Sequence, residues 1–162
     1  MDKARRSELK KLLDDFEMKQ REQNRQRDDR RIALEQFLTG YAEKTQSVIK
    51  PGFEEFSAEL GERGHPCTID VDKPTDPADS VSAAKITLTI FPAGATLAHG
   101  NPSLSYKASP NQRKITSSRS TITTSGGIVA GVVGEFGLDE LTRDVVEQHL
   151  LDLATTIFAP QT

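Results

Sequence analysis

The sequence predicts an α+β protein, in which an antiparallel β-meander of four or five strands packs against a C-terminal helix, with a long N-terminal helix and a proline-kinked second helix. Apolar residues have helical spacing up to about residue 63, alternate from residue 65 onwards, and regain helical spacing after residue 139. We expect two domains, a projecting amphipathic and charged helix at 1–45 and an α+β globular domain at 46–162.

The first helix is expected to have apolar ends and a polar middle. Residues 19–31 contain no apolar side chain and no helix-breaking residue, which is typical of a helix that crosses water. A strict 4-3 spacing, typical of a coiled coil, runs through both ends of the helix and through this polar run. Its members are Leu9, Leu13, Phe16, Gln20, Gln23, Arg27, Arg30, Leu34, Phe37 and Tyr41.

The second helix is expected around Pro51-Gly52. Proline lacks a backbone donor and disfavours helix at the residue before it, so we expect a kink or boundary at Lys50. Phe53, Phe56 and Leu60 continue an amphipathic pattern to about Arg63. Gly64 is suited to cap the helix.

Alternation of apolar and polar residues predicts the strands. Cys67, Ile69 and Val71 mark the first strand, and 85–90 is the clearest strand in the chain. A proline-containing loop at 73–80 separates the two. Leu104 and Tyr106 mark a third strand, 113–124 a fourth, and 128–133 a fifth strand or a bulged continuation. The short connections favour an antiparallel meander.

The final helix is expected to begin at an Asp139 cap and to end near Phe158, before Pro160. It has a broad apolar face, and its His149 is expected to be a partly buried structural residue. The apolar face of the sheet needs a cover, which this helix and the segment around Phe53 can supply.

Composition predicts a cytoplasmic protein. The single cysteine, Cys67, cannot form an intramolecular disulfide, which favours a reducing compartment. No signal peptide, and no apolar run that could span a membrane, is evident. Residues 1–50 have a net charge of +3 and residues 51–162 of −6, an asymmetry too small to imply DNA binding.

The sequence favours a protein that is not an enzyme, with no catalytic residue, metal ligand or cofactor assigned. The glycine-rich stretch 125–137 lacks the Lys-Ser/Thr pair of a phosphate-binding loop, and Glu135 would repel an anion. His65 and Cys67 do not form the paired ligands of a zinc site, and Cys67 is expected to be a small buried hydrophobic residue. A small-molecule pocket between the sheet and the C-terminal helix remains an open possibility.

A run without acidic residues suggests a possible anion-binding face. No Asp or Glu occurs between Asp79 and Glu135, whereas five cations do. Lys85 and Lys107 are expected on the outward face of the sheet, and serine and threonine residues coat the fourth strand. Together they would suit a nucleic-acid backbone or another polyanion. The five cations are Lys85, Lys107, Arg113, Lys114 and Arg119.

Our preferred hypothesis is a protein-interaction and oligomerisation module that assembles through its N-terminal helix. Leu9, Leu12, Leu13 and Phe16 are candidate partner-binding residues, because helical anchors at this spacing dock onto a second copy or another helical protein. The alternatives are that residues 1–30 pack on the body, and that the chain binds nucleic acid or a polyanion through its sheet face.

Overall fold

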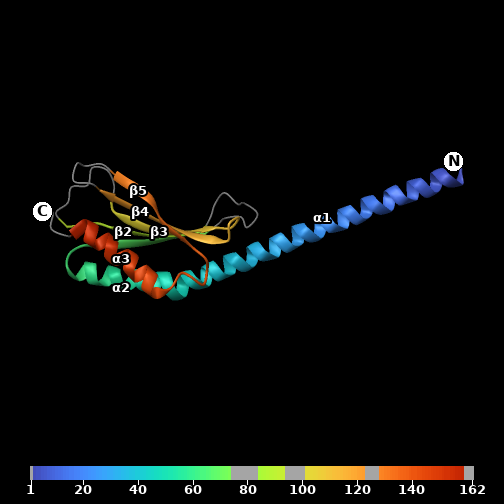
Figure 1. The fold of residues 1–162 in the computed structure, drawn as a ribbon. Helices are drawn as coiled ribbons and strands as arrows, with labels where there is room; N and C mark the ends of the chain where they lie inside the picture. The colour runs from blue at the N-terminus through green and yellow to red at the C-terminus, as the bar shows by residue number, and fades with distance from the viewer. Residues whose placement is uncertain (1, 74–83, 94–100, 123–127, 159–162) are drawn as a thin grey trace. The chain divides into compact units, whose positions relative to one another are not determined.

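The computed structural model confirms the α+β architecture: a long N-terminal helix, a five-stranded antiparallel sheet and a C-terminal helix (Figure 1). It describes residues 2–73, 84–93, 101–122 and 128–158. Several parts of the sequence discussed above lie outside the described residues. They are most of the predicted loop at 73–80, the end of the predicted fourth strand at 123–124, residues 125–127 of the glycine-rich stretch, and Pro160.

Two compact units divide the chain, Met1–Gln36 and Phe37–Thr162. The first consists of most of helix α1 (Lys3–Lys44), whose start is capped by Asp2: its carboxylate accepts a hydrogen bond from the Arg5 amide at 2.8 Å. The expected domain boundary at residue 45 remains a prediction. Phe37 and Tyr41, which precede it, are buried in the core of the second unit.

A short π-helical segment, η1 (Thr45–Ile49), joins α1 to helix α2 (Lys50–Glu62). The kink or boundary expected at Lys50 is a boundary, because the wider π-helical segment ends at Ile49 and α2 begins at Lys50. Pro51 lies in the first turn of α2, where its missing amide donor costs little. Gly64 caps the end of this helix as expected: its φ is 84°, and the next amide, of His65, donates to the Leu60 carbonyl at 2.9 Å.

The sheet is a meander in the order β1-β2-β3-β4-β5, with every neighbouring pair antiparallel. A bulge opposite Ser117 and Ser118 leaves Val133 without a partner in β4, so the expected bulge belongs to a fifth strand. The strands are β1 (Cys67–Asp72), β2 (Lys85–Ile90), β3 (Ser103–Ser109), β4 (Lys114–Ile122) and β5 (Ile128–Phe136).

Helix α3 (Arg143–Phe158) begins three residues later than expected. Residues 138–140 form a turn instead, in which the Glu140 amide donates to the Gly137 carbonyl, and this turn buries Leu141. The cap is Thr142, whose hydroxyl accepts a hydrogen bond from the Val145 amide at 3.4 Å. The expected Asp139 cap is therefore wrong.

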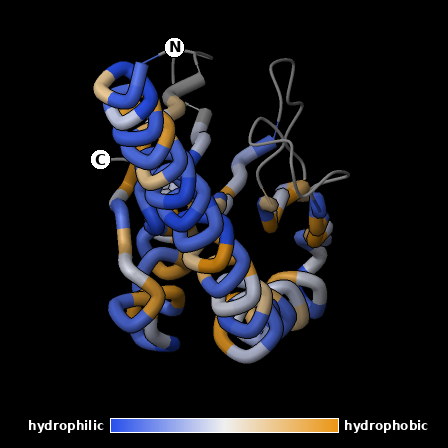
Figure 2. Tube along the Cα trace, turned by 90° about the vertical axis from the view of Figure 1, so that its right-hand side faces the viewer, coloured by the Kyte–Doolittle hydropathy of each residue, from blue (hydrophilic) through white to orange (hydrophobic). Residues whose placement is uncertain are grey.

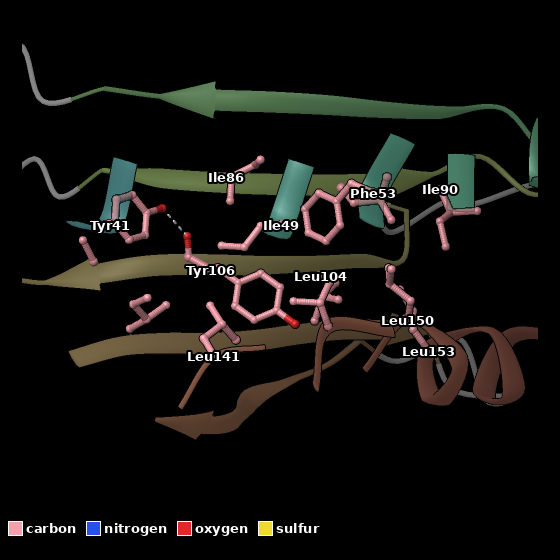
Figure 3. Packing of buried hydrophobic residues seen from close by; sticks show 14 of the residues in the cluster. Tyr41, Ile49, Phe53, Ile86, Ile90, Leu104, Tyr106, Leu141, Leu150 and Leu153 are labelled. Atoms are coloured by element: carbon pink, nitrogen blue, oxygen red, sulfur yellow. Dashed lines mark hydrogen bonds between the residues drawn. The ribbon is translucent and has the colours of Figure 1, made fainter. Parts of the chain in front are cut away.

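The core lies between one face of the sheet and helices α2 and α3 (Figures 1 and 3). Ile49 and Phe53 approach the sheet from η1 and α2, and Leu150 and Leu153 from α3. Both predicted covers of the sheet are thus confirmed. Arg143 of α3 forms an ion pair with Glu55 of α2, which joins the two helices at their exposed edges. A second ion pair, with Glu147, lies within α3.

Tyr41 fixes the end of α1 in this core. Its hydroxyl donates a hydrogen bond of 2.8 Å to the backbone carbonyl of Tyr106 in β3 (Figure 3). The Lys44 ammonium donates to the Leu141 carbonyl at 3.2 Å. Burial raises the pKa of Tyr41 to about 12, so its hydroxyl remains a donor at neutral pH. The last two turns of α1 therefore belong to the folded unit of the sheet.

Candidate partner-binding site

The four predicted anchor residues lie on one face of α1, and all four are exposed. Leu9, Leu12, Leu13 and Phe16 follow each other at intervals of three and four residues, so they share one side of the helix. Their exposed fractions lie between 44% and 62%. Met18, which is 67% exposed, falls on the opposite side. We call the four residues the apolar face.

The polar run at residues 19–31 is helical throughout, and all of its residues are exposed. Much of the long helix has the colour of hydrophilic residues in Figure 2. Arg25 forms ion pairs with Glu22 at 2.6 Å and with Asp29 at 3.9 Å, and the hydrogen bond from Arg25 lowers the pKa of Glu22. Such exposed pairs contribute little to stability, because water screens them.

At the C-terminal end of the 4-3 pattern, two apolar side chains are buried within their own chain. Phe37 and Tyr41 pack in the core of the second unit, so they cannot serve a partner unless that core opens. Leu9, Leu13 and Phe16, at the N-terminal end of the pattern, are exposed instead. This distinction between the two ends was not visible in the sequence, where both have the same spacing.

Two of the predicted anion-binding residues meet directly on the sheet. Lys85 and Lys107 are cross-strand partners in β2 and β3, on the face opposite the helices, which we call the open face. Asp72 in β1 pairs with Lys85, and Glu135 in β5 lies beyond Thr116 in the same row. The row therefore has a carboxylate at each end and two lysines between them, so it is not uniformly basic.

The other three cations do not extend this row. Lys114 begins β4, and Arg113 lies in the preceding turn with a φ of 53°. Arg119 pairs with Leu104, and directly opposite residues of paired strands point to the same side. Because Leu104 is in the core, Arg119 lies on the helix-covered face. The expectation that it continues the basic surface is therefore wrong.

A buried polar cluster that the sequence did not reveal lies beneath α3. The Tyr106 hydroxyl and Nδ1 of His149 are 2.6 Å apart, and the ring of Phe136 packs against the imidazole with centroids separated by 5.5 Å. Ser117, the cross-strand partner of Tyr106, is fully buried, and its hydroxyl has no hydrogen-bond partner among the described residues. The sequence indicated the inward Tyr106 and the half-buried His149, but not that they touch.

The polar groups of this cluster stabilise the fold and are not charged. Burial raises the pKa of Tyr106 and lowers the pKa of His149. The charge of Asp152 raises the pKa of His149 and that of Arg119 lowers it, each by less than burial does. Both groups are therefore neutral at pH 7, and their hydrogen bond satisfies two polar atoms beneath α3. No nucleophile activated by His149 is present among the described residues, since the Tyr106 hydroxyl is protonated and buried.

Cys67 is only half-buried, which corrects the expectation of a buried residue; it lies in β1, an edge strand of the sheet. Burial raises the pKa of its thiol, whereas a reactive cysteine requires a lowered one. Val71 in the same strand is exposed. Within the described ranges, no three His, Cys, Asp or Glu side chains are grouped closely enough to hold a metal ion.

Comparison with family models, curated proteins and solved structures gave no match. Among the helices that the structure describes, none is both long and apolar enough to cross a membrane. The function must therefore be argued from the surfaces described above.

Proposed function

We propose that this chain is a non-enzymatic assembly module of the cytoplasm, which binds a second copy of itself through the apolar face of α1. One observation supports this proposal above the others: Leu9, Leu12, Leu13 and Phe16 are large, lie on one side of a helix, and are about half exposed. Grouped apolar side chains on a helix are typical of a docking face.

The free apolar area supports a weak contact. Full burial of such a side chain is worth about 1.5–3 kcal/mol, so covering the exposed half contributes about 1 kcal/mol each. Eight side chains from two copies then give about 8 kcal/mol, against an association cost of about 4–15 kcal/mol. The net gain is then at most about 4 kcal/mol, so we expect a dissociation constant of about 1 mM or weaker.

The extent of the contact is also limited. Beyond Phe16, the seam positions are Gln20, Gln23, Arg27 and Arg30, which cannot form a tight apolar core. Phe37 and Tyr41 stabilise the fold of their own chain. The assembly is therefore restricted to the first part of α1.

A sedimentation-velocity experiment tests this function. At about 2 mM, near the expected dissociation constant, the intact chain should sediment faster than a monomer. The Leu13→Glu/Phe16→Glu variant should sediment as a monomer. Met18→Glu is the matched control, because it places the same charge on the opposite side of the same helix; it should assemble like the unchanged protein. Equal behaviour of all three proteins would refute the proposal.

The direct pairing of Lys85 with Lys107 favours a second candidate function, binding of nucleic acid or another polyanion on the open face. Asp72 and Glu135 in the same row weaken it, because they would repel a phosphate backbone. A mobility-shift titration at low salt separates the candidates. Lys107→Glu should abolish binding if this function is present, and absence of binding by the unchanged protein would remove it.

A further inference from the structure

The charges beside the apolar face determine how two copies can pair, and the inference that follows rests on the self-association proposed above. In the heptad notation abcdefg, Leu9 and Phe16 occupy d, and Leu13 occupies a. Lys10 and Glu17 then occupy successive e positions on one flank of the apolar face. Neither forms an ion pair with another described residue, so both are available to a partner.

A parallel pair is disfavoured by charge. In parallel coiled coils identical seam positions meet, so Arg6, Arg27 and Arg30 would each oppose the same arginine of the second copy. The flanking g and e positions would place Arg5 against Lys10 of the second copy, twice by symmetry. No attractive contact between flanking charges offsets these repulsions.

An antiparallel pair in one register removes every one of these conflicts. With Leu13 opposite Phe16 of the second copy, the two-fold axis repeats each contact. Lys10 then faces Glu17 of the second copy, giving two attractive pairs. Leu9 lies opposite Gln20, and Arg6 opposite Gln23, so no arginine meets another. The aliphatic stem of Lys19 can cover Leu12.

The neighbouring antiparallel register, shifted by one heptad, is disfavoured by the same charges. It would place Leu9 opposite Leu13 of the second copy, which is favourable for the apolar contacts. It would also bring Lys10 against Lys10 and Arg5 against Lys19. We therefore propose that two copies pair antiparallel through α1, with Leu13 opposite Phe16 and Lys10 opposite Glu17 of the second copy.

Charge reversal distinguishes the orientations by the sign of its effect. Lys10→Glu should weaken the antiparallel dimer by on the order of 10-fold, because it creates two repulsive contacts with Glu17. In a parallel dimer the same substitution would strengthen association, since Glu would face Arg5. Glu17→Lys should also weaken the dimer, and the double variant Lys10→Glu/Glu17→Lys should restore it. Strengthening by Lys10→Glu would overturn the proposed orientation.

A distance measurement gives the register directly. A spin label at Asn24→Cys, in a Cys67→Ser chain, should show an intermolecular distance of about 30 Å, from 19 residues of axial offset at 1.5 Å each and a helix separation of about 10 Å. The shifted register predicts about 40 Å, and a parallel dimer about 10–15 Å. Either of these distances would overturn the inference while leaving self-association in place. A monomeric unchanged protein would instead refute the proposed function itself.

Discussion

Phe37 offers the sharpest test of how far the folded unit extends into α1. Its side chain is 4% exposed, whereas Ile32, five residues earlier in the same helix, is 46% exposed. Replacing a buried phenylalanine by alanine removes its transfer free energy and leaves a cavity, at a cost of about 3–5 kcal/mol. Ile32→Ala should cost about 0.5 kcal/mol or less, because it removes no core contact.

Urea unfolding followed by far-ultraviolet circular dichroism measures the difference. For a unit of this size the denaturant slope is about 2 kcal/mol per molar urea, so Phe37→Ala should lower the midpoint by about 1.5–2.5 M. Both substitutions are made in the Leu13→Glu/Phe16→Glu chain, so that assembly does not contribute to stability. Equal midpoints for Phe37→Ala and Ile32→Ala would show that the end of α1 is not part of the core.

Three further predictions concern the polar contacts and the close packing of the second unit. Tyr41→Phe should lower the free energy of unfolding by about 1–2 kcal/mol, measured in urea, because it removes a buried hydrogen bond to a backbone carbonyl; no loss would mean that the hydroxyl does not hold α1 to the sheet. Burial lowers the pKa of His149 below its usual 6.5, so the unfolded chain binds more protons as the pH falls through that value. The free energy of unfolding should therefore decrease below pH 6.5, and His149→Phe should flatten this decrease; an unchanged pH dependence would contradict the burial of the imidazole. Gly134→Ala should be destabilising in thermal melts, because the added Cβ would lie 2.8 Å from the Phe136 ring, whereas Gly131→Ala, which meets no atom within 4 Å, is the control and should change little.

The order of elements could be read from the sequence because each has a strong local signal. Alternation in β2 (Lys85–Ile90) is regular, and Gly64 provides the positive φ that ends α2. Local signals do not predict the helix boundaries and side-chain orientations that tertiary contacts determine. Leu141 is buried in the core directly after a turn, and α3 therefore begins later than its local sequence predicts. The cross-strand register places Arg119 on the helix-covered face of the sheet.

The candidate site was predictable only in part, for the same reason. Spacing identified Leu9 and Phe16 as members of one helical face, but it placed Phe37 and Tyr41 on the same seam as well. Only the three-dimensional packing shows that the second pair is buried within its own chain, while the first is exposed. The contact of Tyr106 with His149 joins residues 43 positions apart, and no local pattern encodes it.

Self-association of the unchanged chain is the central claim, and sedimentation equilibrium tests it most directly. Over a range of about 0.02–2 mM, the average mass should rise with concentration from that of one 17.8 kDa chain towards twice that value. High salt should weaken this rise, because the Lys10–Glu17 contacts are exposed. A mass that stays at 17.8 kDa across the whole range would contradict the account.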